Sequence, residues 1–180
     1  AQVISAVQTI ISRSTDPVDK ALISITKINA GTAYNVIDDQ VKMGGTIRTF
    51  KKETRSYIEK RLGELCKGIA EAHGAEIKIQ FDLVNKYPPT INSKKESIFA
   101  SNVAKDLVGE DKVITDIDPS MGGEDFSYLL EEKPGTYLYL GQGDEEHKAH
   151  LHTTKYDFND NLLPLGVNFW VELVKKYFSK

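Results

Sequence analysis

The sequence has few of the features that mark several large classes of protein. Its single cysteine, Cys66, cannot form a disulfide within the chain, which excludes a disulfide framework of the kind found in small secreted domains. No apolar stretch approaches the roughly 20 residues that a membrane-spanning helix needs. No run of lysine and arginine is longer than an isolated pair, so we expect no nucleic-acid partner, and with no spanning stretch we expect no membrane partner either.

Several motifs for catalysis and targeting are also absent. The sequence contains neither the G-x-S-x-G elbow of a serine hydrolase nor a glycine-rich phosphate-binding loop. The first thirteen residues lack the positively charged start of a secretory signal peptide. Because Cys66 falls within a helical pattern, we interpret it as a buried structural thiol in a reducing compartment and expect a cytoplasmic protein.

The remaining composition is that of a globular protein. The chain has 180 residues, of which 40% are hydrophobic and 27% charged, enough for one sizeable core or two small ones. Residues 1–90 hold 13 basic and 10 acidic side chains, whereas residues 91–180 hold 10 and 16. This asymmetry suggests two differently composed halves.

The first half predicts the order helix, strand, strand, helix, strand. Helical spacing occupies the first eleven residues, and β-rich runs cover 21–28 and 41–50. A longer helix follows and ends at His73–Gly74, after which apolar residues alternate over 77–83. This order is one strand short of the β-α-β-β-α-β unit, so we expect that a strand is missing at the front.

The second half begins after a proline-containing segment near residues 85–92. Ser93 and Glu96 form a capping-box pattern that opens a helix ending at Gly109. Further elements complete a layered α/β pattern. They are a strand over 113–118, a helical turn to Glu132, a strand over 136–141, and a final helix with Leu163, Val167, Trp170, Val174 and Phe178 on one face.

Three of the four histidines, His147, His150 and His152, fall within six residues of one polar loop. On an extended segment, His150 and His152 would point to the same side, as two ligands of one metal do. The alternative is a solvated polar loop.

A second candidate is the segment MGGEDF at 121–126, whose glycines allow close approach of the backbone to a ligand. Glu124 and Asp125 would start the following helix, and the alternative is that they are simply charges at its positive end.

The third candidate is the pair Asn35 and Arg48. If their two runs are adjacent antiparallel strands, the two side chains could converge at one end of the sheet and bind a carboxylate. Arg48 as an ordinary surface charge is the alternative.

These segments together carry a resemblance to a known family. In chain order they are SRSTDPV (12–18), GTAYNVIDD (31–39), GTIRTF (45–50), YPPTIN (87–92), MGGEDF (121–126) and LHTTKYDFND (151–160). They resemble the co-catalytic metallopeptidase family of amidohydrolases, which includes hippurate hydrolases, auxin-conjugate hydrolases and related carboxypeptidases.

The resemblance implies a fold and a division into domains. Residues 1–88 would be a ferredoxin-like lid domain that lacks its first strand and forms a homodimer. Residues 89–180 would be the C-terminal part of an α/β metallopeptidase catalytic domain.

The resemblance also implies roles for individual residues. His152 matches a metal ligand, and Asn35 and Arg48 match lid residues that hold the substrate carboxylate. A loop lining the substrate cleft is matched by Gly122, Gly123 and Glu124. Asp38 stands where the family usually has proline.

The implied activity is hydrolysis of the amide bond in N-acyl amino acids or small peptides, with two divalent metals. Zinc is expected, and manganese, cobalt and nickel are alternatives. The general base and the other metal ligands are expected before residue 1, so we predict that this chain alone is inactive. A non-catalytic dimerisation or ligand-binding module is the alternative function.

Overall fold

The computed structural model describes residues 1–81 and 86–179. This part of the chain divides into two compact units. The first unit comprises Ala1–Pro89 with Ser120–Asp125, and the second comprises Thr90–Pro119 with Phe126–Lys180. Among the described helices, none combines the length and the apolar character needed to cross a membrane.

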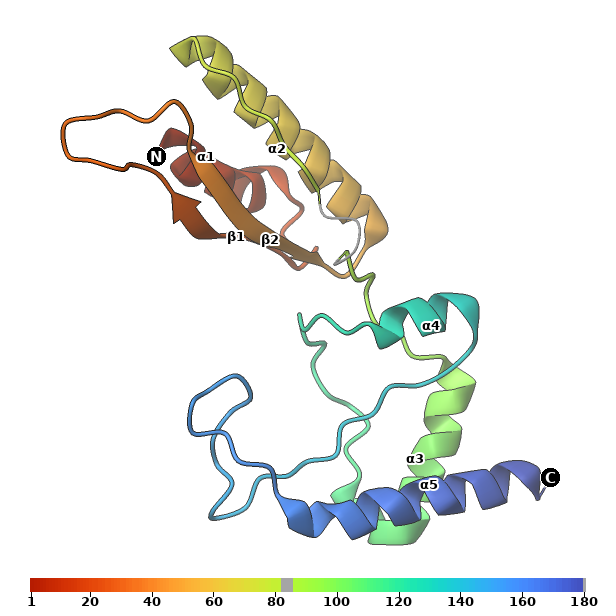
Figure 1. The fold of residues 1–180 in the computed structure, drawn as a ribbon. Coiled ribbons are helices and arrows are strands. Elements are labelled where there is room, and N and C mark those ends of the chain that lie inside the picture. The colour runs from red at the N-terminus through yellow and green to blue at the C-terminus, as the bar shows by residue number, and fades with distance from the viewer. Residues whose placement is uncertain (82–85, 180) are drawn as a thin grey trace. The chain divides into compact units, whose positions relative to one another are not determined.

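The first unit is built of a helix, a β-hairpin and a second helix (Figure 1). The hairpin strands are antiparallel, and Ile23 of the first strand lies opposite Ile47 of the second. The predicted order helix, strand, strand, helix is confirmed. The elements are α1 (Gln2–Thr9), continued by a π-helical turn η1 (Ile10–Ser14), then β1 (Ala21–Asn29), β2 (Lys42–Thr49) and α2 (Lys52–His73).

An apolar core joins the two helices to the hairpin. Residues at helical spacing on α1 meet one face of β1 and the inward stripe of α2, because a 3.6-residue period places them on one side of each helix. Burial raises the pKa of the Cys66 thiol, which agrees with its predicted structural role. The buried members of this cluster are Val3, Val7, Ile10, Ile23, Ile58 and Cys66.

The end of α2 follows the predicted capping signal. Gly74 adopts a left-handed conformation with φ 60°, and its N–H donates to the carbonyls of Ala70 and Glu71. The N–H of Ala75 also donates to the Ala70 carbonyl, over 2.9 Å. A glycine is favoured at this position because it has no Cβ to clash in the left-handed region.

The predicted strand over 77–83 is not found in the described part of this segment. Residues 77–81 form no strand, and Leu83 lies outside the described residues. An extended segment becomes a strand only when a neighbouring strand supplies backbone partners. Among the described residues, β1 and β2 pair only with each other.

The second unit is mainly helical. Its two long helices pack together, and the rings of Phe99 and Tyr177 meet edge-on with centroids 6.1 Å apart. The predicted final helix is confirmed, but its apolar face, including Trp170, is exposed in this chain. The elements are α3 (Lys94–Val108), η2 (Glu110–Lys112), α4 (Phe126–Glu132), η3 (Asp160–Leu162) and α5 (Leu163–Phe178).

The strands predicted over 113–118 and 136–141 are not observed. At Tyr137 a side chain, and not a neighbouring strand, forms hydrogen bonds with the backbone. The Asn92 amide donates to the Tyr137 carbonyl over 2.9 Å and accepts from its N–H over 2.7 Å. This side chain bonds Tyr137 as one residue of a neighbouring strand would, but it cannot propagate a ladder.

The start of α3 also differs in detail from the prediction. The helix begins directly after Ser93, as predicted, but the Ser93 hydroxyl makes no capping bond to it. Instead it accepts a hydrogen bond from the N–H of Gly135 over 3.2 Å, and the N–H of Ser93 donates to the Gly135 carbonyl over 2.8 Å. The hydroxyl therefore serves a contact between distant segments and not the predicted capping box.

Candidate functional site

In the first unit, Arg48 is held on the open face of the β-hairpin. It lies opposite Leu22, whereas the neighbouring pair Ile23 and Ile47 faces the helices. This follows from the alternation of side chains along a strand. Arg48 Nη1 donates a 2.7 Å hydrogen bond to the carbonyl oxygen of Met121, which is 73 residues away in sequence. The predicted arginine and the predicted glycine loop are therefore neighbours.

The loop that contains Gly122 and Gly123 is exposed at both glycines, but it packs closely against a neighbouring side chain at Gly123. The Gly122 N–H donates to the Ser120 hydroxyl over 3.2 Å. A Cβ on Gly123 would lie 3.2 Å from the Tyr87 ring, so a larger residue would force that ring to move. Helix α4 begins at Phe126, so Glu124 and Asp125 lie directly before the helix and not within its first turn. Glu124 is half-buried in the loop itself.

Asn35 does not converge with Arg48 in this chain. It is exposed in the loop that joins Asn29 to Lys42, whereas Arg48 lies near the opposite end of β2. Arg48 is six positions along β2 from Lys42, which corresponds to roughly 20 Å. Antiparallel pairing places the connecting loop and Arg48 at opposite ends of the hairpin, so the pairing does not bring the two side chains together.

The Asn35 loop is closed by the residue that departs from the family pattern. The Asp38 carboxylate accepts hydrogen bonds from the Gly31 N–H at 2.9 Å and from the Thr32 hydroxyl at 3.0 Å. Gly31 has a φ of 83°, a conformation that favours glycine. In this sequence the aspartate therefore closes the loop with hydrogen bonds.

In the second unit, the candidate metal ligand lies in a long loop. We name residues 143–158 the histidine loop. His150 and His152 do not lie on an extended segment: His152 is exposed with a left-handed φ of 63°, within a turn. The Thr153 hydroxyl donates to the His150 carbonyl over 2.8 Å, and the Tyr156 N–H donates to the Thr153 carbonyl over 3.2 Å. The expectation that both rings share one side of a strand is wrong, because these bonds fold the segment into turns.

The start of the histidine loop is organised by one carboxylate. Asp144 Oδ1 accepts hydrogen bonds from the backbone N–H groups of His147 and Glu146, at 2.8 and 2.9 Å, and contacts His147 Nδ1 at 2.8 Å. The backbone bond from His147, its ring contact and the backbone bond from Glu146 lower the pKa of Asp144 to about 2. The contact with Asp144 raises the pKa of His147.

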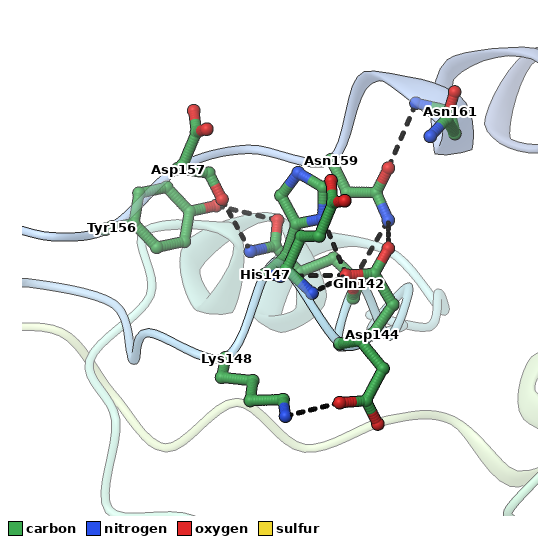
Figure 2. Close-up of polar contacts among 10 residues, drawn as sticks. Gln142, Asp144, His147, Lys148, Tyr156, Asp157, Asn159 and Asn161 are labelled. Carbon is green, nitrogen blue, oxygen red and sulfur yellow. Dashed lines mark hydrogen bonds and ion pairs between the residues drawn. The ribbon is translucent and has the colours of Figure 1, made fainter.

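The two ends of the histidine loop are joined by amide side chains (Figure 2). Asn159 Nδ2 donates to Asp144 Oδ2 over 2.9 Å and to the Gln142 carbonyl over 3.2 Å. Gln142 in turn donates to the Asp157 carbonyl and accepts from the Tyr156 hydroxyl, each over 3.1 Å. We name Gln142, Asp144 and Asn159 the clasp.

The sequence interpretation missed the clasp. Two local signals for it exist, since Asp144 follows Gly143 in a composition typical of an Asx turn, and Asn159 stands directly before an apolar helical run, as a cap does. Neither signal indicates that the two side chains meet across 15 residues.

The described residues do not form a metal site by themselves. No three of their His, Cys, Asp or Glu side chains are grouped so that they could hold a metal ion. A catalytic zinc needs about three protein ligands, whereas His152 can supply one imidazole. His152 alone therefore supplies too few ligands for a catalytic metal.

Comparison with known proteins places this arrangement in a family. The model of the peptidase family M20/M25/M40 matches residues 2–176. Hippurate hydrolase of Campylobacter jejuni is 38% identical over 98% of this chain and 45% of its own length. IAA-amino acid hydrolase ILR1-like 2 of Arabidopsis thaliana is 32% identical over 100% of this chain and 41% of its own length.

A solved structure gives the same result. The Bacillus subtilis YXEP protein, described as a dinuclear metal binding peptidase from the M20 family, has a TM-score of 0.72 and 29% identity, over 96% of this chain and 43% of its own. The chain thus spans less than half the length of these relatives. The match to the family model covers nearly the whole chain, and on this ground the chain belongs to the peptidase family M20/M25/M40.

Proposed function

We propose that the intact protein hydrolyses the amide bond of N-acyl amino acids or small peptides. The relatives named above are hydrolases of hippurate and of IAA-amino acid conjugates, and in both substrates an acyl group is joined to an amino acid that keeps a free carboxylate. The observation that carries the proposal is the placement of Arg48 beside the loop Gly122–Glu124. These are four of the residues that the family resemblance assigns to substrate binding.

Arg48 would bind the substrate carboxylate. A guanidinium offers five N–H donors in a planar fork that matches a carboxylate, and the bond to the Met121 carbonyl uses one of them. That bond also reduces the freedom of the side chain, so less entropy is lost when the carboxylate binds. The exposed backbone of Gly122 and Gly123 would let the substrate approach closely.

The role of Asn35 stays a prediction of the family resemblance. Within this chain Asn35 and Arg48 lie at opposite ends of the hairpin, so the proposal for the carboxylate site depends on Arg48.

His152 would donate one imidazole to a pair of divalent metals, with zinc as the expected ion and manganese, cobalt or nickel as alternatives. When bound, such metals polarise an amide carbonyl and activate water for attack on it. The other ligands and the general base would come from parts of the intact protein outside this chain. The description of the YXEP protein as a dinuclear metal binding peptidase supports this assignment.

We also propose a domain identity for each unit and a cellular location for the intact protein. The first unit would be the ferredoxin-like lid and dimerisation domain, whose four-stranded sheet would need two further strands in addition to β1 and β2, and the second unit would be part of the catalytic domain. The buried thiol of Cys66 supports a reducing, cytoplasmic location. Light scattering by the intact protein tests the dimer, and a monomeric mass would contradict it.

The function is tested by incubating the intact protein with a panel of N-acyl amino acids. We expect release of the free amino acid, loss of this activity with a chelator, and its return when zinc or manganese is added. The same acyl groups on amines without a carboxylate should be poor substrates, because they offer Arg48 no anion. No metal-dependent hydrolysis of any member would contradict the proposal and favour the dimerisation or ligand-binding module.

A further inference from the structure

The histidine loop is long, polar and exposed, yet many hydrogen bonds fix its conformation. A loop of this length with no apolar interior would sample many conformations unless side chains closed it, because each ordered residue costs conformational entropy. The residue that closes it is Asn159, which is only 5% exposed, whereas the loop that precedes it is mostly exposed.

The amide of Asn159 uses both of its ends. Its Nδ2 donates to Gln142 and Asp144 at the start of the histidine loop, over 3.2 and 2.9 Å. Its Oδ1 accepts from the Asn161 N–H over 3.1 Å and so caps η3, which leads into α5. A single side chain thus joins the first residues of the loop to the helix that follows the loop (Figure 2).

Hydrogen bonds link the turn that holds His152 to this closure. His152 adopts φ 63°, which is unfavourable for a residue other than glycine and persists only when the surrounding structure enforces it. The turn at His150–Thr153 and the Tyr156–Gln142 bond connect His152 to the clasp through hydrogen bonds. Opening the clasp would release the backbone of Gln142, and with it the side chain that accepts the hydrogen bond from Tyr156.

We propose that Asn159 is a positioning residue, whose amide clamps Gln142 to Asp144 and thereby sets the conformation of the loop that carries His152. The conformational part stands on the geometry alone, and its consequence for metal binding rests on the proposed function. Groups that hydrogen-bond a ligand histidine directly typically change metal affinity by about 10- to 100-fold when replaced, so for Asn159, which acts through the loop, we expect the lower end of that range.

The test uses Asn159→Asp in the intact protein. The new carboxylate can still accept the Asn161 N–H and cap η3, but it cannot donate, and it places a second negative charge beside Asp144. The matched control is Asn161→Asp, which makes the same chemical change two residues away, at an exposed side chain outside the clasp. A third protein combines Asn159→Asp with Asp144→Asn, which restores one donor–acceptor pair with the roles exchanged.

The first measurement is hydrogen–deuterium exchange, which does not depend on activity. In the Asn159→Asp protein we expect amides of the histidine loop to exchange at least tenfold faster, with amides of α2 unchanged. The double variant, Asn159→Asp with Asp144→Asn, should recover part of the protection against exchange. Asn161→Asp should behave as the wild type. Unchanged exchange of the loop in Asn159→Asp would overturn the proposal.

The second measurement is metal affinity, by competition with a chromophoric zinc chelator, together with the split of kcat and KM. We expect Asn159→Asp to bind zinc about tenfold more weakly, with a lower kcat and little change in KM. A loosened loop with unchanged zinc affinity would overturn the positioning role toward His152. If the wild-type protein bound no zinc, the proposed function would fail, and the exchange experiment alone would decide whether Asn159 sets the loop.

Discussion

The two units of the chain hold their conformation by different means. The first unit buries a continuous set of apolar side chains from α1, β1 and α2. In the second unit, Ala100 and Val103 of α3 are the buried hydrophobic residues among those described, and the other buried side chains are Ser127 and Asn159. The first unit therefore depends on hydrophobic burial, and the histidine loop of the second depends on hydrogen bonds.

This difference matches the chemistry expected of each part. An apolar core under a hairpin gives a rigid surface on which Arg48 is displayed, as a charged recognition residue needs. A metal-ligating histidine needs a defined orientation in a polar setting, and hydrogen bonds from neighbouring side chains supply that orientation. Substitutions should therefore affect the units in different ways.

The largest expected effect is on the apolar core. Ile58 is fully buried, so Ile58→Ala should lower the free energy of unfolding by about 2–5 kcal/mol, because it removes buried methyl groups and leaves a cavity. The control is Ile98→Ala on α3, where the side chain is 52% exposed and the loss should stay below about 1 kcal/mol. Urea denaturation followed by circular dichroism measures both. Equal losses would remove the distinction between the units.

The next effect is on the substrate binding that we propose for Arg48. Arg48→Ala in the intact protein should raise KM about tenfold or more with little change in kcat, because the lost contact holds a part of the substrate that does not react. Lys42→Ala removes an exposed positive charge near the other end of β2 and should leave KM unchanged. Steady-state kinetics on an N-acyl amino acid tests this. An unchanged KM in Arg48→Ala would remove Arg48 from the site.

A smaller effect concerns the titration of His147, which contacts Asp144 of the clasp. The carboxylate of Asp144 raises the pKa of His147, so Asp144→Asn should lower the His147 titration midpoint toward its ordinary value of 6.5. NMR of the imidazole ring protons across pH measures the midpoint in both proteins. The same midpoint in both would show that the contact does not exist in solution.

The same pair sets a pH window for the histidine loop. Because the pKa of His147 is raised in the folded loop, its protonated ring stabilises the loop fully below pH 6.5. This stabilisation is lost as the pH rises through the raised pKa. Because the pKa of Asp144 is lowered, its carboxylate stabilises the folded loop fully above pH 3.8. This stabilisation is lost as the pH falls through about 2. Exchange protection of the loop should therefore be greatest between about pH 4 and 6.5, and a maximum above pH 8 would contradict the assignment.

The smallest expected effect is at the exposed face of α5. Trp170, the single tryptophan, is 63% exposed in this chain, so its fluorescence should be quenched by acrylamide almost equally before and after unfolding in urea. Strong protection in the folded chain would show that the second unit buries more apolar surface than the structure has.

Local patterns predicted the helices well. The apolar stripe of α2 and its glycine stop at Gly74 depend on residues within one or two turns, so the sequence contains the information needed. The same holds for α3, whose end at Gly109 was predicted.

Features that depend on distant partners were not predicted correctly. The run of tyrosine and leucine over 136–141 is strand-like, but no strand partner lies beside it among the described residues, and Asn92 bonds Tyr137 instead. The expected convergence of Asn35 with Arg48 failed for a related reason, because the direction of pairing places the loop and Arg48 at opposite ends of the hairpin. The clasp depends on the closure of a long loop, which composition and periodicity do not encode.

The central claim is that this chain supplies His152 as one ligand of a catalytic metal pair. The direct measurement is the metal content of the purified intact protein, by inductively coupled plasma mass spectrometry, for His152→Ala beside His73→Ala. His73 is an exposed histidine at the end of α2 in the first unit, and its replacement removes an imidazole without touching the histidine loop. We predict that His152→Ala loses bound metal and amide hydrolysis while His73→Ala keeps both, and full metal content with normal turnover in His152→Ala would contradict the claim.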